Sequence, residues 1–204
     1  KKFKFFKKYK NDLYFFIVSR RRYANDIGNI IGSIALNKKY KLNPIVISDL
    51  DYNSGYNKIF KFFGLNFFEK VFRFKLIFIH PIIFLVSLTH TLKCIINIFI
   101  FGFEWLIDDF KLRSIKIGDL IYDTYTRYDH KYINPSIDFK LINVIFKSIF
   151  RTIKSLKLIK IYRPKIILVG TDGYSYNDGV MMRIGLKNKI KVYECQPFYI
   201  DENF

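Results

Sequence analysis

The sequence predicts an α/β fold that is Rossmann-like, with a largely parallel sheet flanked by helices and a helix-rich middle segment. Three short apolar runs carry this prediction: Leu13–Val18, Ile45–Ser48 and Ile166–Val169. Continuous apolar runs of this length are typical of strands that are buried on both faces, as in parallel sheets. Stretches with helical periodicity separate the runs, which is the order of elements in βαβ units.

The first half of the chain predicts one βαβ unit. The strand Leu13–Val18 is followed by a polar loop, Ser19–Asn25, and Asp26 can then cap a helix. Pro44 opens the next strand, Ile45–Ser48. The apolar residues of the helix recur at a spacing that predicts one apolar face; they are Ile27, Ile30, Ile31, Ile34 and Ala35.

The middle of the chain is apolar and predicts helices. Leu76–Leu92 contains no Lys, Arg, Asp or Glu, which raises the question of a membrane span. The run is at the short limit of about 17 residues for such a span, and it contains His80, Pro81 and Ser87. We therefore favour buried or membrane-apposed helices. A small membrane protein built around Leu76–Ile107 stays open as an alternative.

The second half predicts another βαβ unit. Ile117–Tyr128 is expected to be a helix entered through Gly118, and Asp138–Tyr162 a longer helix. The longer helix has apolar residues at helical spacing, with lysines on the other face: Leu141, Ile145, Ile149, Ile153 and Leu156. After the strand Ile166–Val169, a helix capped by Asn177 leads into the strand Ile190–Tyr193.

Composition narrows the classes of partner. The 204 residues are 50% hydrophobic and carry a formal net charge of +18. Such charge suits nucleic acid, an anionic membrane or an anionic substrate, but no nucleic-acid motif is present, so no nucleic-acid partner is expected. Cys94 and Cys195 lack metal-ligand spacing, and no metal site is predicted. Gly28 and Gly32 have the wrong spacing for a dinucleotide fingerprint, so no cofactor is expected to bind this chain.

Two runs carry the most specific information. The first motif, Ile117–Arg127, reads IGDLIYDTYTR, and the second motif, Val169–Arg183, reads VGTDGYSYNDGVMMR. Each places a glycine and a carboxylate at the start of a predicted helix and an arginine further along it. The two motifs resemble those of bacterial enzymes of capsule and surface-polysaccharide synthesis, which are glycosyltransferases or close relatives with two Rossmann-like domains (the GT-B architecture). The resemblance covers most of Asp26–Gln196.

The resemblance implies that residues 1–204 are the N-terminal, acceptor-side domain of such an enzyme. The chain lacks an initiator methionine and stops after a predicted strand, so we expect the C-terminal nucleotide-sugar domain to be missing and the chain to be inactive alone. The complete enzyme would transfer a sugar from a nucleotide-sugar donor to a glycan or lipid-linked acceptor. The resemblance implies a cytoplasmic protein, with peripheral contact to the anionic inner face of the membrane. A non-catalytic binding or scaffold protein of polysaccharide assembly is the alternative.

Loops that follow the predicted strands supply several site residues, because ligands of open parallel sheets bind beyond the carboxyl ends of the strands. Arg21 and Arg22 follow the first strand and are expected to hold an anionic group, such as the diphosphate of a lipid-linked acceptor. Asp172 is the candidate general base and Tyr174 a candidate contact to substrate. Where the family often has Ser-His, this chain has Thr171-Asp172. The alternative role of Asp172 is a turn residue.

The motif helices supply the remaining candidates, all for substrate binding. Asp119, Asp123 and Arg127 share one helical face at a spacing of four residues, with Tyr122 beside them. They are either an intrahelical ion pair or, as the resemblance implies, a face that binds sugar hydroxyls. Asp178 falls in the first turn of the second motif's helix, where the helix dipole also favours it. Arg183 can reach a carboxylate, and Asp119 or Asp123 is its expected partner.

Overall fold

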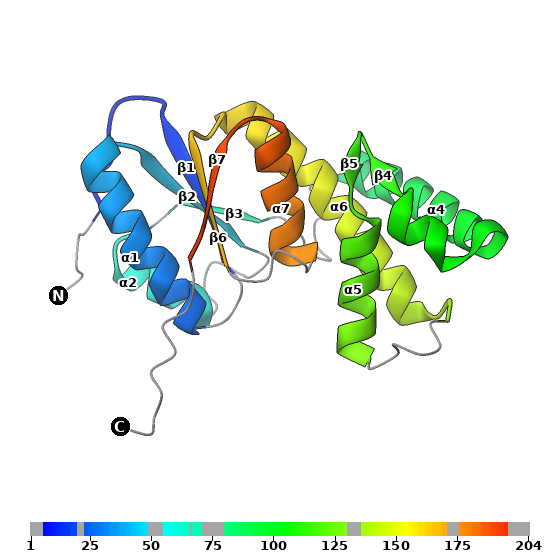
Figure 1. Ribbon diagram of the computed structural model, residues 1–204. Helices are drawn as coiled ribbons and strands as arrows, with labels where there is room; N and C mark the ends of the chain where they lie inside the picture. Colours follow the sequence, from blue (N-terminus) through cyan, green and yellow to red (C-terminus); the bar gives the residue numbers. More distant parts are fainter. Residues whose placement is uncertain are drawn as a thin grey trace, which may run out of the picture. The chain divides into compact units, whose positions relative to one another are not determined.

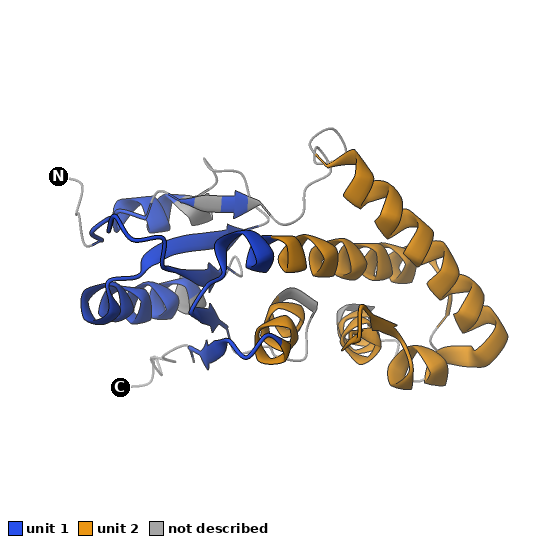
Figure 2. Ribbon diagram, turned by 90° about the horizontal axis from the view of Figure 1, so that it is seen from above, with its two compact units in different colours: residues 1–71, 158–171, 188–204 blue, residues 72–157, 172–187 orange. Residues whose placement is uncertain are grey.

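The computed structural model describes residues 6–19, 23–48, 55–65, 67–70, 80–129, 136–170 and 176–195. The chain forms two compact units, which Figure 2 distinguishes by colour. Unit 1 comprises Lys1–Val71, Leu158–Thr171 and Asn188–Phe204, and unit 2 comprises Phe72–Lys157 and Asp172–Lys187. The expected Rossmann-like domain over residues 1–204 is thus divided, with the sheet in unit 1 and the helix-rich segment in unit 2.

Unit 1 is built on a five-stranded parallel sheet with the strand order β3-β2-β1-β6-β7 (Figure 1). An order that runs outward from β1 in both directions is the arrangement of Rossmann-like folds. This confirms the predicted α/β class. The strands are β1 (Tyr14–Val18), β2 (Asn43–Ser48), β3 (Phe68–Lys70), β6 (Ile166–Val169) and β7 (Lys191–Glu194). Each strand predicted from an apolar run is present, with ends that agree to within two residues.

Helices α1 (Tyr23–Tyr40) and α2 (Gly55–Phe62) pack against each other, and α1 contacts β1, β2 and β6. One hydrophobic core joins these helices to alternate residues of the strands, as the period-two geometry of strands requires. Its fully or nearly fully buried members are Phe15, Ile17, Ile30, Leu42, Val46, Phe60, Leu65, Ile166 and Leu168. Phe16 contacts the Tyr162 ring instead, at a centroid distance of 6.0 Å.

The prediction of one apolar face on α1 is wrong in part. Ile30 is buried, but Ile27 and Ile31 are 44% and 57% exposed. Asn29 and Asn37 take inward positions because carbonyl groups at the strand ends need donors. The Asn29 side-chain amide donates to the Val18 carbonyl at 3.2 Å, and that of Asn37 donates to the Leu42 carbonyl at 2.9 Å.

The predicted cap of α1 is also wrong. The helix already begins at Tyr23, so Asp26 lies in its first turn. There Asp26 is fully buried and accepts a hydrogen bond from the Ser19 hydroxyl at 3.3 Å. A carboxylate in the first turn still benefits from the positive end of the helix dipole.

Unit 2 is mainly helical. It contains α4 (Pro81–Asp108), the hairpin of β4 (Lys111–Leu112) and β5 (Ile115–Lys116), α5 (Gly118–Asp129), most of α6 (Phe139–Tyr162) and α7 (Tyr176–Lys187). Helix α5 contacts both α4 and α7. The predicted helices 117–128 and 138–162 are confirmed to within one residue. Helix α7 already includes Tyr176, so Asn177 lies inside its first turn and not at the cap.

The core positions of α6 could be predicted from the sequence, but the burial of one of its lysines could not. Leu141, Ile145, Ile149 and Ile153 are buried as expected, and the Asp138 carboxylate caps the helix by accepting from the Leu141 N–H at 2.8 Å. The expectation that the lysines face outward is wrong for Lys154, which is 5% exposed. Its ammonium lies 2.9 Å from His80 Nε2, and this contact offsets the cost of burial.

Helix α4 forms the described part of the apolar middle of the chain. It starts at Pro81, where a missing N–H costs no helical hydrogen bond, and Gly102 interrupts it with a φ of 79°. By length and composition the helix is able to cross a membrane. Only 22% of its apolar 18-residue stretch is buried inside the protein. The expectation of a buried helix is therefore wrong, while a membrane-apposed helix is compatible with this exposure.

Candidate functional site

Gly118 fixes the start of α5 and thus the position of the first motif. A Cβ at this residue would lie 1.6 Å from the Leu106 carbonyl oxygen and 3.0 Å from Phe110 Cβ. The N–H groups of Ile117 and Gly118 both donate to the Phe110 carbonyl at 3.3 Å. The backbone of α5 can approach the end of α4 this closely only because glycine has no side chain.

Asp119 and Arg183 join the two motifs. Arg183 Nη1 donates to Asp119 Oδ1 at 2.6 Å and Nη2 donates to Oδ2 at 2.7 Å, which is a bidentate ion pair. The side chains are 29% and 31% exposed. Such paired bonds are stronger and more directional than a single contact. The expected link from Arg183 to a carboxylate of the first motif is confirmed, and Asp119 is the partner.

The β4–β5 hairpin also accepts hydrogen bonds from the cations of α7. Arg183 Nη1 also donates to the Lys116 carbonyl at 2.8 Å, and the Lys187 ammonium donates to the Arg113 carbonyl at 2.8 Å. Arg113 and Ser114 both have positive φ, 50° and 63°, as the tight turn of a two-residue hairpin requires. The hairpin thus presents two carbonyl groups to the cations of α7, one from its turn and one from β5.

The two carboxylates of α5 differ in their electrostatics. Partial burial would raise the pKa of Asp119, but the hydrogen bonds and charge of Arg183 outweigh it and hold the pKa below its usual value. Burial raises the pKa of Asp123, which Arg127 opposes and the nearby Asp119 charge reinforces. Asp119 is therefore a structural anion, and Asp123 is the carboxylate of this pair that is better suited to accept a proton or a hydroxyl hydrogen bond.

The other described candidates lie on the same two motif helices, α5 and α7. Tyr122 is half-buried, with its ring 6.1 Å from that of Phe103, and Arg127 is exposed. Asp178 is fully buried in the first turn of α7. This placement favours stabilisation by the helix dipole over contact with a substrate. Arg21, Arg22, Asp172 and Tyr174 lie outside the described residues.

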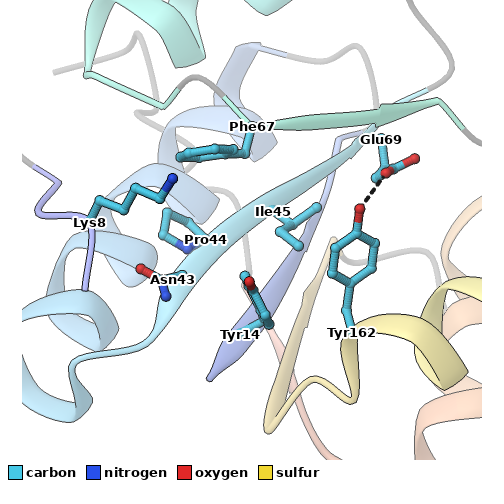
Figure 3. Close-up of a pocket in the computed structure, with 8 residues that line it drawn as sticks. All are labelled: Lys8, Tyr14, Asn43, Pro44, Ile45, Phe67, Glu69 and Tyr162. Atoms are coloured by element: carbon cyan, nitrogen blue, oxygen red, sulfur yellow. Dashed lines mark hydrogen bonds between the residues drawn. The ribbon is translucent and has the colours of Figure 1, made fainter. Parts of the chain in front are cut away.

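Unit 1 has a separate cavity of about 410 Å³ that the motifs did not indicate (Figure 3). It is lined by Lys8, Tyr14, Asn43, Pro44, Ile45, Phe67, Glu69 and Tyr162. Tyr14 and Asn43 are the first residues of their strands, so the cavity lies toward the amino ends of β1 and β2. Ligand sites of open parallel sheets are expected at the carboxyl ends of the strands, so the sequence did not predict this cavity.

The cavity combines aromatic rings with polar tips. The Tyr162 hydroxyl donates to Glu69 at 2.6 Å, and the Tyr14 and Tyr162 rings meet edge to face at 5.5 Å (Figure 3). Burial, followed by the hydrogen bond to Glu69, raises the pKa of Tyr162 to about 12. The Lys8 ammonium lies 4.9 Å from the centre of the Phe67 ring. Such a lining suits a ligand with both apolar and hydroxyl-bearing faces.

The described part of the chain contains the free cysteines Cys94 and Cys195. No group of three or more His, Cys, Asp or Glu side chains within it could hold a metal ion. Cys94 is buried, and burial raises the pKa of its thiol to about 12, so the thiol stays protonated.

Comparison with protein-family models, curated proteins and solved structures found no match.

Proposed function

We propose that this chain is the acceptor-side part of a glycosyltransferase of surface-polysaccharide assembly. The observation that carries the proposal is the bidentate bond between Asp119 and Arg183. It joins the two motifs on which the family resemblance rests, although they are separated by 64 positions in the chain. The Rossmann-like sheet of unit 1 is compatible with the same architecture.

The proposed chemistry assigns different roles to the residues of α5. Arg183 holds Asp119 in its ionised form, so Asp119 positions the arginine and the helix start. Asp123, with its raised pKa, accepts hydrogen bonds from acceptor hydroxyls, and Arg127 and Tyr122 lie within one helical turn of it. In this proposal Asp172 takes the proton of the attacking hydroxyl, and Arg21 and Arg22 hold an acceptor diphosphate.

The donor is proposed to be a nucleotide-sugar that binds to another domain of the complete enzyme. The nucleotide would leave as the sugar's anomeric carbon bonds to the acceptor oxygen. Sugar transfer of this kind would take place in the cytoplasm, on a glycan or lipid-linked acceptor. The alternative, a binding protein without catalysis, would use the same acceptor site and differ only in the absence of transfer.

Asp123→Asn is expected to weaken binding of the acceptor glycan to this chain by about tenfold or more. A hydrogen bond to a charged group contributes about 1.5–3 kcal/mol, and each 1.4 kcal/mol is about tenfold in affinity. The measurement is calorimetric titration with oligosaccharides and with diphosphate-linked saccharides prepared from bacterial surface polysaccharides.

Asp109→Asn is the matched control for this titration. Asp109 is an exposed carboxylate of unit 2 that follows α4 directly, outside both motifs. The control is expected to bind the saccharide like the wild-type chain. Equal weakening by Asp109→Asn and Asp123→Asn would mean that only the net charge matters, and would contradict a site on α5.

A further inference from the structure

Helix α4 leaves most of its large apolar side chains exposed. Its buried residues are Ile83, Ser87, Thr91, Cys94, Ile98 and Leu106, so small or polar side chains take half of the inward positions. Its outer face, defined here as Ile82, Leu85, Leu92, Ile96, Phe99 and Ile100, is 55–84% exposed. Helices of water-soluble domains normally bury their large apolar side chains. A contiguous apolar surface of this kind marks a site of association.

The inward face of α4 is already occupied within unit 2. The Ser87 and Thr91 hydroxyls donate to the carbonyls four residues earlier, at 2.7 and 2.8 Å, so they need no other partner. Phe84 meets Phe146 of α6 with ring centroids 5.1 Å apart, and α4 contacts α5. The outer face is thus the part of α4 that is left for a partner outside the unit.

The dimensions and charge of α4 fit a lipid surface. From Pro81 to Phe103, Lys93 is the only Lys, Arg, Asp or Glu, and it is exposed. The helix from Pro81 to Phe101 is about 30 Å long at 1.5 Å per residue. A lysine of this kind can place its ammonium among lipid phosphates while its stem stays in apolar surroundings. The net charge of +18 favours an anionic membrane surface.

We infer that the outer face of α4 binds the headgroup–acyl boundary of an anionic lipid bilayer, with the helix parallel to the membrane. The side chains of this face are only Ile, Leu and Phe, without the Tyr, Trp, Met and Arg that are enriched at protein interfaces. A spanning orientation would bring α6 into the hydrocarbon with α4. Arg151 and Lys154 of α6 would make that costly.

The test is flotation of the purified chain with vesicles of phosphatidylcholine and phosphatidylglycerol. The test variant combines Leu85→Gln, Ile96→Gln and Phe99→Gln. The matched control combines Ile31→Gln, Ile161→Gln and Leu186→Gln, whose side chains are 57%, 58% and 61% exposed on other helices. All six side chains are exposed, so circular dichroism should show intact folding in both variants.

Wild type and control are expected to float with the vesicles, and the α4 variant to lose at least about tenfold in partitioning, because interfacial binding scales with buried apolar area. Equal flotation of the α4 variant and wild type would overturn the inference. The inference would also be overturned if neither protein bound vesicles while sedimentation showed a dimer for the wild type and a monomer for the α4 variant. In that case a second copy of the chain would cover α4.

Discussion

Gly118→Ala is expected to destabilise unit 2 by at least about 3 kcal/mol, the upper part of the range for overpacking a protein interior. The added methyl would lie 1.6 Å from the Leu106 carbonyl oxygen and 2.7 Å from its carbonyl carbon. Both atoms belong to the backbone of α4, so no side-chain rotation relieves the clash. The measurement is urea unfolding followed by circular dichroism, with the free energy of unfolding compared between variant and wild type.

Gly32→Ala is the matched control, because Gly32 also lies within a helix. A Cβ there would meet Cys195 Sγ at 3.5 Å and Leu168 Cδ1 at 3.8 Å, which are ordinary van der Waals contacts. Alanine should therefore raise the free energy of unfolding by about 0.5–1 kcal/mol, its usual advantage over glycine in a helix. Wild-type stability for Gly118→Ala would contradict the close approach of α5 to α4.

Arg183→Met is expected to lower the free energy of unfolding by about 1.5–3 kcal/mol, the range for hydrogen bonds to charged groups. The substitution removes both bonds to Asp119 and the bond to the Lys116 carbonyl. Arg183→Lys should recover only part of the loss, because an ammonium cannot form the bidentate contact. A double-mutant cycle with Asp119→Asn isolates the pair, and additive effects would show that the two side chains are not coupled.

The Asp119–Arg183 pair makes the free energy of unfolding depend on pH in the acid range. The pKa of Asp119 is lower in the folded chain than in the unfolded chain, where it has the ordinary aspartate value. The unfolded chain therefore binds the proton more readily, and stability falls as the pH falls. The contribution is complete above the unfolded pKa, at about 4, and is lost as the pH falls through the lower folded value. Asp119→Asn should flatten this part of the pH profile.

Three central strands and the helices of the second half could be predicted because their patterns are local. Strands β1, β2 and β6 are continuous apolar runs, and α6 has apolar residues at helical spacing with Asp138 at its start. The edge strand β3, with the sequence Phe-Glu-Lys, has no such pattern, and the sequence did not predict it. A bond from Arg183 to Asp119 or Asp123 could also be predicted, because each motif places charged residues on a predicted helix. What local pattern cannot supply is the inward orientation of Asn29 and Lys154, which depends on partners distant in the sequence.

The face of α4 and the cavity of unit 1 show a second limit of the sequence. An apolar helix has the same composition whether its large side chains point inward or outward, so the exposure of Leu85 and Phe99 required the structure. The cavity joins Lys8, Glu69 and Tyr162, which come from three separate parts of the chain. Strand order and helix placement bring them together, and no spacing in the sequence encodes that.

The most direct test of the account is transfer of radiolabelled sugar from nucleotide-sugar donors to lipid-linked and glycan acceptors. The protein to use is the one encoded by the complete reading frame that contains this chain. Labelled product is expected, and Asp172→Asn is expected to lower turnover by at least about a hundredfold, within the usual range for a lost general base. Acceptor binding without transfer from any donor would contradict the proposed function and identify a non-catalytic binding protein.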